Sequence, residues 1–319
     1  MKKILISLIF FSILVLLFIN LRDEIKKIDE KYLSYFLHEI YYSIIGRNIN
    51  EDNLRNNYES YAIQKNDNLN KISTYNFKYN WIKSNNFFFI AHRGGNILLT
   101  GENTKETFKK NLNKFNFFEV DLVLTEDNKI ILYHQHTLDA ENNNKNISLN
   151  IEKSILSRGW NPTYLDEILP LISKNQYLIL DIKSNFQNTI KEIEKQFSHY
   201  TNQMIPQLYH FKNLNEYNVE NFASPIFTSY ASKIKTSKIF ENAKKFNIKA
   251  ITLTKVRVEK LKKFPEDFMI FTHSVDSLFE AYKYKSMGID GFYTKVFFES
   301  AFPEFKSDQD KFKIEIYNH

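Results

Sequence analysis

The chain of 319 residues has no cysteine, only seven glycines and only six prolines. The lack of cysteine excludes disulfide bonds and thiolate metal sites. The formal net charge is +6, but the basic residues form no continuous block. Because nucleic-acid binding favours a clustered basic stripe, we expect no nucleic-acid partner. Hydrophobic residues make up 43% of the chain, which is typical of a globular protein with a buried core.

The N-terminal residues combine Lys2 and Lys3 with an apolar run over residues 4–19. This pattern resembles a secretory signal, but no Ala-x-Ala cleavage pattern follows it. The run would span roughly 24–27 Å at about 1.5 Å per residue, which is within the range of a membrane-spanning helix. We expect residues 1–21 to form an uncleaved membrane anchor that leaves the rest of the chain extracytoplasmic. The alternative is a signal sequence whose cleavage releases a secreted or periplasmic protein.

Residues 22–86 differ from the rest of the chain in composition. Residues 22–48 carry apolar side chains near helical spacing, and residues 49–80 are rich in asparagine and polar. We expect a short helical region and a stalk, or a segment that covers the following domain. Residues 301–319 are predicted to be a C-terminal tail.

From residue 87 onward, short apolar runs alternate with lysine-rich helical stretches. A run over residues 130–134 follows its predecessor too closely to be a parallel neighbour, because parallel strands need a crossover of about a dozen residues. Setting that run aside leaves eight strands and predicts an α/β fold, a (β/α)8 TIM barrel over residues 87–300. The short gap between residues 209 and 225 predicts a brief or irregular fifth helix. The eight runs cover residues 87–91, 117–124, 177–182, 204–209, 225–230, 250–254, 269–275 and 291–294.

Three of the few glycines, Gly94, Gly95 and Gly101, follow the first predicted strand. In a chain so poor in glycine, they indicate a backbone that turns tightly or approaches a ligand. A plain strand-to-helix turn is the alternative. His92 and Arg93 stand at the carboxyl end of this strand, where barrel active sites form, so we predict that they are functional.

Glu119 and Asp121 lie two residues apart in the second predicted strand and therefore point to the same face. Two buried carboxylates repel each other and lose hydration, so such groups are usually paired or bound to a metal. A hard cation such as Ca²⁺ or Mg²⁺ would compensate both. The alternative is a strand whose polar face is exposed to water.

Residues 126–129 predict a turn, after which the chain returns through residues 130–134. If the turn centres between Asp127 and Asn128, His134 lies opposite Asp121. This register predicts a histidine beside the carboxylate pair, at the mouth of the barrel. A solvent-facing His134 is the alternative, and His136 is a weaker candidate with the same facing direction.

The third predicted strand ends in Asp181 and Lys183, which share one face. Asp181 can complete a three-carboxylate metal site, and Lys183 can meet a phosphate oxygen as a point charge. A simple ion pair between the two residues is the alternative.

Taken in order, these motifs resemble the signature of glycerophosphodiester phosphodiesterases, which are TIM barrels related to phosphoinositide phospholipase C. Residues 102–104, 124–125 and 162–167 also resemble parts of this signature, and the resemblance covers residues 87–300. It implies a phosphoric diester hydrolase that uses one divalent cation, Ca²⁺ or Mg²⁺, to convert a glycerophosphodiester into an alcohol and glycerol phosphate. The implied residues are the acid–base pair His92 and His134; the phosphate-facing Arg93 and Lys183; the cation ligands Glu119, Asp121 and Asp181; and the supporting or pocket residues Glu102, Gln207, Tyr209 and His273.

The sequence departs from the family pattern in three places. Asp181 stands where the family usually has glutamate, which reaches one methylene further, so the affinity or choice of cation is open. Gln135 stands where aspartate is usual. The insertion after that position, residues 136–162, is short, so we expect an open site that admits a bulky or membrane-held substrate. The substrate would be a glycerophosphodiester or a phospholipid-derived molecule.

Two other functions remain open from the sequence. One is a related lipid-cleaving barrel of the phospholipase D or C type. The other is a membrane-tethered module that binds phosphate without turnover. Intact histidines and carboxylates favour the enzyme.

Overall fold

The protein is described by a computed structural model over residues 75–82, 87–95, 100–134, 148–215, 219–229, 232, 234–261 and 263–295. The expected anchor, the C-terminal tail, Gln135 and His136 lie outside these residues, and the expectations for them remain predictions. Within the described ranges, no helix combines the length and apolar character needed to cross a membrane.

The described strands form one sheet that closes on itself as a barrel. Its order is β1-β9-β8-β7-β6-β5-β4-β2-β3, and an additional β1–β2 pairing joins the two sides. All pairings are parallel except β2–β3, so the predicted eight-stranded parallel barrel is confirmed and β3 is an antiparallel strand outside it. The strands are β1 (Phe88–Ala91), β2 (Phe117–Leu124), β3 (Ile130–Leu132), β4 (Tyr177–Ile182), β5 (Met204–Leu208), β6 (Ile226–Thr228), β7 (Ala250–Thr254), β8 (Met269–His273) and β9 (Gly291–Thr294).

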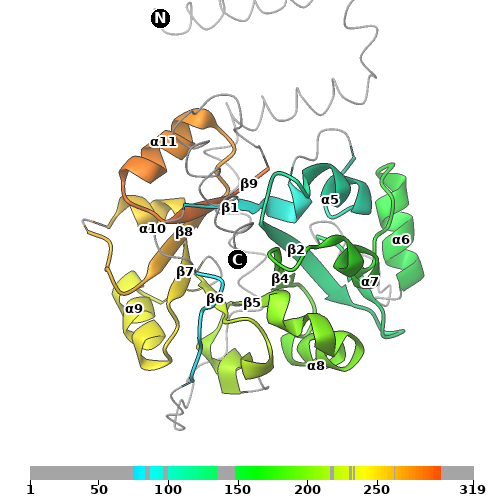
Figure 1. Ribbon diagram of the computed structural model, residues 1–319, viewed down its shortest axis with the longest axis horizontal. Helices are drawn as coiled ribbons and strands as arrows, with labels where there is room; N and C mark the ends of the chain where they lie inside the picture. The colour runs from blue at the N-terminus through cyan, green and yellow to red at the C-terminus, as the bar shows by residue number, and fades with distance from the viewer. Residues whose placement is uncertain are drawn as a thin grey trace, which may run out of the picture. The chain divides into compact units, whose positions relative to one another are not determined.

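Helices surround the ring of strands (Figure 1). Between β5 and β6 the described residues contain only short 3-10 turns, so the predicted irregular fifth connection is confirmed. The α-helices are α5 (Lys105–Asn111), α6 (Ser148–Ser157), α7 (Leu165–Ile168), α8 (Phe186–Phe197), α9 (Thr236–Lys245), α10 (Lys255–Glu259) and α11 (Leu278–Ser286). The 3-10 turns are η1 (His92–Gly94), η2 (Leu169–Leu171), η3 (Ser198–Gln203), η4 (Phe211–Asn215) and η5 (Val219–Asn221).

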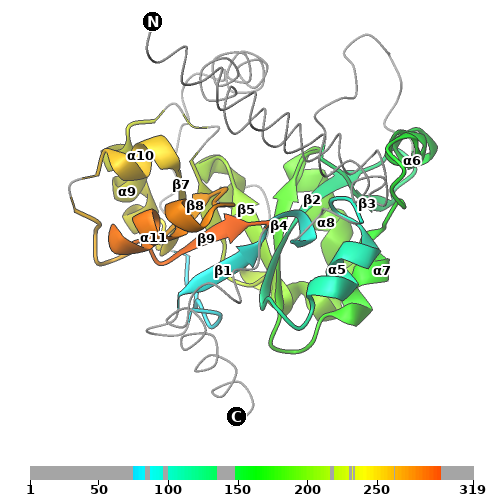
Figure 2. The ribbon, with the colours of Figure 1, turned by 90° about the horizontal axis from the view of Figure 1, so that it is seen from above.

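Helix α6 belongs to the segment that corresponds to the short insertion. It lies beside β3, outside the ring of strands (Figure 2). Its buried Ile151 and Ile155 pack on Val123, Ile131 and Tyr133 of the β2–β3 hairpin, forming an apolar cluster separate from the barrel core. Burial of this hairpin face fixes its orientation relative to the barrel.

An aromatic strap, defined as Tyr75, Phe77, Tyr79 and Trp81, crosses the barrel at the amino ends of its strands. The indole of Trp81 packs against Phe88 and Phe117, with ring centroids 6.2 and 6.0 Å away. These two phenylalanines are the first residues of β1 and β2. The strap therefore closes the end of the barrel opposite the carboxyl ends of the strands.

Hydrogen bonds tie the same strap to neighbouring strands. The hydroxyl of Tyr79 donates to the carbonyl of Pro225 at 3.0 Å and accepts from the backbone N–H of Lys249 at 2.9 Å. The indole N–H of Trp81 donates to the carbonyl of Ser224 at 2.8 Å. These partners directly precede β6 and β7, so the buried polar atoms of the strap are satisfied where the rings pack.

The β2–β3 hairpin differs from its predicted register. Leu122 lies opposite Leu132, and the backbone N–H of Tyr133 donates to the carbonyl of Asp121 at 3.0 Å. Asp121 is therefore paired with Tyr133 and not with His134, and the predicted register was wrong by one residue.

The length of the loop explains this shift. The backbone N–H of Thr125 donates to the carbonyl of Lys129 at 2.9 Å, which leaves residues 126–128 as a three-residue loop. Asn128 takes a left-handed conformation with φ of 59°, a conformation that asparagine tolerates better than most residues. A three-residue loop ending in such a residue is a common hairpin connection, and it displaces the returning strand by one residue compared with the two-residue loop assumed.

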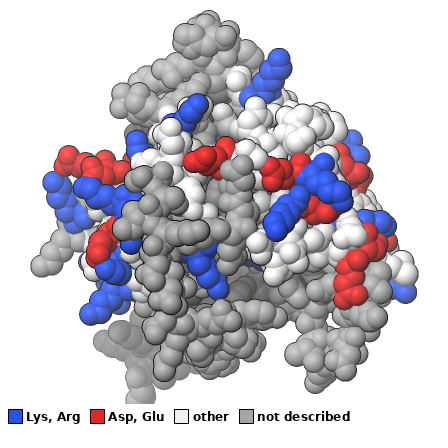
Figure 3. Space-filling view, turned by 90° about the horizontal axis from the view of Figure 1, so that it is seen from below, with Lys and Arg blue, Asp and Glu red and all other residues white. Residues whose placement is uncertain are grey.

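Charged side chains of both signs are interspersed on the outside of the protein. On the face shown in Figure 3, Lys and Arg side chains lie next to Asp and Glu side chains in groups at the left and the right. Exposed ion pairs of the protein include Lys244–Asp267, with Nζ 3.2 Å from Oδ2. Exposed pairs of this kind contribute little to stability, about 0–1 kcal/mol each.

Candidate active site

The site begins where β1 ends. Arg93 has φ 55° and ψ 39°, a left-handed conformation that is rare for a large side chain and that concentrates at functional sites. This conformation directs its backbone N–H to Oε2 of Glu119 at 2.8 Å. At Gly94, with φ of 87°, a Cβ would lie 2.9 Å from the ring of Phe108, so the turn needs glycine for steric reasons as well.

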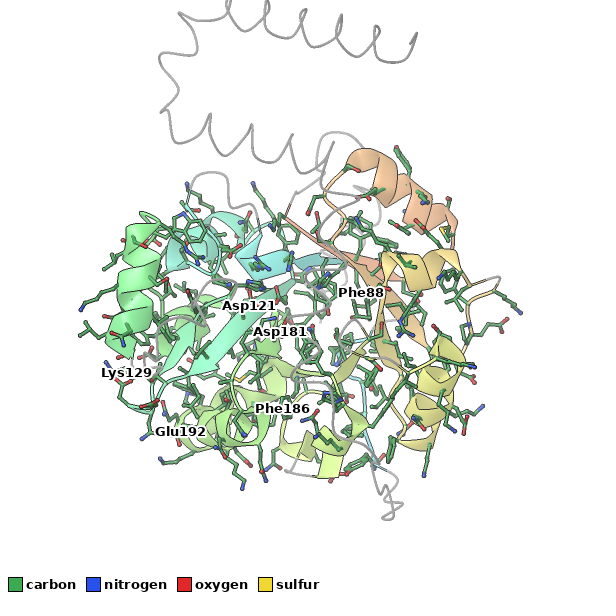
Figure 4. The ribbon with its side chains drawn as sticks, turned by 180° about the vertical axis from the view of Figure 1, so that it is seen from behind. Phe88, Asp121, Lys129, Asp181, Phe186 and Glu192 are labelled. Atoms are coloured by element: carbon green, nitrogen blue, oxygen red, sulfur yellow. The ribbon has the colours of Figure 1, made fainter. Side chains whose placement is uncertain are left out.

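Three carboxylates gather at the mouth of the barrel. Glu119 and Asp121 come from β2, and Asp181 lies beside Asp121 in the register of β4. One oxygen atom from each lies within 4.8 Å of the others, and all three residues are at most 2% exposed. Figure 4 shows Asp121 and Asp181 next to each other near the centre of the barrel, far from the peripheral Lys129. The structure thus brings together the three residues predicted as cation ligands.

Two cationic side chains lie within this acidic cluster. Nζ of Lys183 is 3.1 Å from Oδ1 of Asp121 and 2.7 Å from Oδ2 of Asp181. Arg93 Nε is 3.3 Å from Oδ2 of Asp121, and its Nη1 is 2.6 Å from Oε2 of Glu102. The ion pair considered for Asp181 and Lys183 is therefore present, as part of a larger network.

Asn103 is a further member of the site that received no role from the sequence alone. Its amide donates to Oδ2 of Asp121 at 2.9 Å, and its Oδ1 accepts from the backbone N–H of Asp121 at 3.2 Å. Asn103 takes φ of 57°, directly after Glu102 and close to Gly101. The sequence feature that could have identified Asn103 is its place in a turn that contains glycine. Asparagine tolerates a left-handed backbone, and its side chain offers both a hydrogen-bond donor and an acceptor.

Burial and mutual repulsion shift the acidities of the three carboxyls in different directions. Burial, followed by the negative charges of Asp121 and Asp181, raises the pKa of Glu119 well above its ordinary value. Burial also raises the pKa of Asp181, although Lys183 opposes this shift. For Asp121, burial is outweighed by Lys183, His134 and Arg93 together, which hold its pKa below the ordinary value. One carboxylate is therefore well compensated, and the other two are not.

This charge distribution fits a divalent cation. The four acidic groups, the carboxylate cluster and Glu102, face two cationic side chains, which leaves an excess of negative charge. The raised pKa of buried Glu119 reflects that incomplete compensation. The donor atoms are all carboxylate oxygens, which suit hard cations such as Ca²⁺ or Mg²⁺.

Two imidazoles flank the cluster. Nε2 of His92 is 3.9 Å from Oε2 of Glu119, and Nε2 of His134 is 4.0 Å from Oδ1 of Asp121. His134 reaches this position despite the shifted register, because β3 ends at Leu132 and strand alternation no longer directs its side chain. Burial, followed by the charge of Arg93, lowers the pKa of His92 well below its ordinary value.

His273 lies at the end of β8, beside the first histidine. Its ring centroid is 5.0 Å from that of His92 and 5.2 Å from that of Tyr293. Burial, with the charges of Lys183 and Arg93, lowers the pKa of His273 to about 4, so it is neutral at physiological pH. It is therefore an uncharged wall of the site next to His92.

The other residues expected to support the site lie behind Asp181. The hydroxyl of Tyr209 donates to Oδ1 of Asp181 at 2.6 Å, and Nε2 of Gln207 donates to the hydroxyl of Tyr209 at 3.2 Å. Tyr293, whose hydroxyl donates to Oε1 of Gln207 at 3.1 Å, was not anticipated. Its strand was predicted, but its partner lies 86 residues earlier in the chain, and no local pattern connects the two.

A closed parallel barrel with buried carboxylates, cations and imidazoles at the carboxyl ends of its strands defines a TIM-barrel enzyme with an oxygen-ligand site for phosphate chemistry. Residues 92–278, more than half of the chain, match the model of the glycerophosphoryl diester phosphodiesterase family. The chain belongs to this family and is a phosphoric diester hydrolase.

Solved structures with similar folds include three relevant proteins. A glycerophosphodiester phosphodiesterase from Parabacteroides distasonis has a TM-score of 0.52 at 15% identity, over 72% of this chain and 98% of that one. The corresponding enzyme from Thermotoga maritima has a TM-score of 0.50 at 19% identity, over 66% and 94%. An Oleispira antarctica phosphodiesterase, in complex with the product sn-glycerol-3-phosphate, has a TM-score of 0.53 at 14% identity, over 70% and 97%. No curated protein matches the chain significantly.

Proposed function

We propose that the protein hydrolyses a glycerophosphodiester to an alcohol and glycerol phosphate, using one divalent cation and an acid–base pair formed by His92 and His134. The observation that carries this proposal is the position of two imidazoles beside a buried three-carboxylate cluster, one 3.9 Å from Glu119 and the other 4.0 Å from Asp121. The glycerol phosphate found with the Oleispira phosphodiesterase, which shares the fold, supports the choice of substrate class.

Phosphate binding is assigned to the cationic side chains within the cluster. Arg93 and Lys183 already lie at 2.7–3.3 Å from the carboxylates of β2 and β4, so a phosphate placed over the cluster would be within their reach. Arg93 presents several N–H donors in a planar arrangement that suits phosphate oxygens, and Lys183 supplies a point charge. A cation held by Glu119, Asp121 and Asp181 would supply additional stabilisation of the negative charge on the phosphate.

The two histidines are assigned to proton transfer. One imidazole accepts the proton of the attacking oxygen as the new O–P bond forms. The other donates a proton to the oxygen of the departing alcohol as its bond to phosphorus breaks, so the alcohol leaves uncharged. The attacking oxygen belongs either to water or to a neighbouring substrate hydroxyl, in which case a cyclic phosphate forms first.

A release assay tests the proposal. The purified protein is incubated with a panel of glycerophosphodiesters that differ in the alcohol, and glycerol phosphate is measured with and without EDTA. Lysophospholipids are included to detect the lipid-cleaving alternative. We expect release that EDTA abolishes and that added Ca²⁺ or Mg²⁺ restores. Release that is insensitive to EDTA contradicts the cation, and binding of the panel without release favours the phosphate-binding module instead.

A further inference from the structure

Asp181 is held from behind by a hydrogen-bonded chain that crosses the interior of the barrel. Thr252 on β7 lies 3.2 Å from the hydroxyl of Tyr293 on β9, which donates to Gln207 on β5 at 3.1 Å. Gln207 donates to the hydroxyl of Tyr209 at 3.2 Å, and Tyr209 donates to Asp181 at 2.6 Å. These four residues, from β5, β7, β9 and the position just after β5, form a linear chain of hydrogen bonds. The chain ends at Oδ1 of Asp181.

The ionised form of Asp181, which is the form that binds a cation, fixes the direction of every hydrogen bond in this chain. A carboxylate only accepts, so the single proton of Tyr209 points to Asp181 and its oxygen accepts from the amide nitrogen of Gln207. The carbonyl oxygen of Gln207 then faces Tyr293, whose proton is used there. Thr252 must therefore donate to the oxygen of Tyr293, and all donors point towards Asp181.

Because these hydrogen-bonded side chains are buried, changing their order of donors and acceptors would be energetically costly. Thr252 and Tyr293 are fully buried and Gln207 is 1% exposed, so a broken link would remove a hydrogen bond at a place shielded from water. Burial also raises the pKa of Tyr293, which keeps its hydroxyl protonated and able to donate. Hydrogen bonds aligned in one direction polarise and strengthen one another.

The second oxygen of Asp181 is positioned separately. Lys183 Nζ lies 2.7 Å from Oδ2, whereas Tyr209 lies on Oδ1. Each carboxylate oxygen has two lone pairs, so an oxygen that accepts a hydrogen bond can also bind a cation. The rotation of this short side chain is therefore fixed by donors on both sides.

We propose that Tyr209 is a positioning residue for Asp181, and that the chain Thr252–Tyr293–Gln207–Tyr209 orients this carboxylate as a cation ligand. This inference rests on the proposed cation site. Hydrogen bonds to ligating groups fix their orientation, and their loss typically weakens metal binding by about 10–100-fold.

The test is a calorimetric titration of Ca²⁺ and Mg²⁺ into the full-length protein and three variants. Tyr209→Phe removes the hydroxyl at Asp181, and we expect the Kd to rise about 10–100-fold. Tyr293→Phe removes a distant link while keeping its ring against the histidines, so a smaller rise is expected. The double variant should bind no more weakly than Tyr209→Phe alone, because the chain is already broken at its last link.

Tyr79→Phe is the matched control, because Tyr79 is a buried tyrosine with two hydrogen bonds at the opposite end of the barrel. Its cation Kd should equal that of the wild type. A Tyr209→Phe variant with wild-type affinity overturns the inference while leaving the proposed function intact. A wild-type protein that binds neither cation overturns the inference together with the proposed cation site. If Tyr209→Phe does not fold, an unchanged Kd in Tyr293→Phe overturns the role of the chain.

Discussion

At the amino ends of the strands, aromatic rings fill the barrel, whereas at the carboxyl ends three carboxylates crowd together out of water. Trp81 and Phe88 are 3% and 2% exposed, and Glu119 and Asp121 are equally inaccessible at 2% and 1%. The same degree of burial has opposite consequences. Burying aromatic surface stabilises the fold by roughly 25 cal/mol per Å², whereas burying adjacent negative charges destabilises it unless they are compensated.

We therefore expect residues at the amino ends of the strands to determine stability and residues at the carboxyl ends to determine activity. The aromatic strap contributes packing and satisfied hydrogen bonds at the amino ends of the strands. The mouth keeps electrostatic repulsion between carboxylates that a divalent cation would relieve on binding. Variants at the two ends should therefore separate activity from stability.

The largest effect is expected for the histidines. His92→Ala and His134→Ala should each lower kcat by roughly 10²–10⁴-fold, because each removes a proton-transfer group. Cation binding should persist, since neither histidine is a proposed ligand. The combined variant should lose much less than the product of the single losses, because the two groups act together.

Exposed His199, on η3, provides the control for this experiment. His199→Ala should keep wild-type kinetics in the same release assay. Near-full activity in both His92→Ala and His134→Ala would contradict the proposed acid–base pair.

At the opposite end, Trp81→Ala should lower the free energy of unfolding by about 3–5 kcal/mol, because it removes a large buried ring and leaves a cavity. Denaturant unfolding of the purified variant measures this change. At a temperature where the variant remains folded, its kcat should match that of the wild type. A fall in kcat without a loss of stability would contradict the division between the two ends.

Tyr79→Phe should have a smaller effect at the same end. The substitution keeps the ring but leaves the carbonyl of Pro225 and the N–H of Lys249 without this partner. A loss of about 1–3 kcal/mol is expected for such buried groups. Unchanged stability would show that other groups or water replace these bonds.

Glu119→Gln should have the smallest effect on folding and the opposite sign. Because the folded-state pKa of Glu119 is raised, its ionisation destabilises the cation-free protein at neutral pH. The variant should therefore be more stable than the wild type, and it should lose activity.

The pH dependence of this stability difference tests its assigned cause. Below the ordinary glutamate pKa of 4.5, Glu119 is protonated in both folded and unfolded states, so the advantage of Glu119→Gln should disappear. As pH rises from 4.5 towards the raised folded-state pKa, the advantage should grow. Thermal unfolding in EDTA between pH 4 and pH 8 measures it, and an advantage that shrinks with rising pH contradicts the assigned cause.

The sequence predicted most of the barrel because each strand is a continuous buried run. Four of the eight predicted strand ranges agree with the structure at both ends, including 117–124 and 177–182. The sequence also predicted which way Glu119, Asp121 and Asp181 face, because residues two apart in a strand point to the same side.

Other features depend on information that local patterns do not contain. The register of the β2–β3 hairpin depends on whether Asn128 adopts a left-handed conformation. The interior chain joins Tyr293 to Gln207, and the strap joins Tyr79 to residues more than a hundred positions later. Such contacts appear only when the barrel closes.

The central claim is that the carboxylate cluster is a cation site, and a crystal structure of the protein grown with Ca²⁺ or Mg²⁺ tests it most directly. We expect one ion within about 2.6 Å of oxygen atoms from Glu119, Asp121 and Asp181, with Tyr209 still donating to Asp181. A well-ordered cluster that binds no ion at saturating cation, with Lys183 still bridging Asp121 and Asp181, would contradict it.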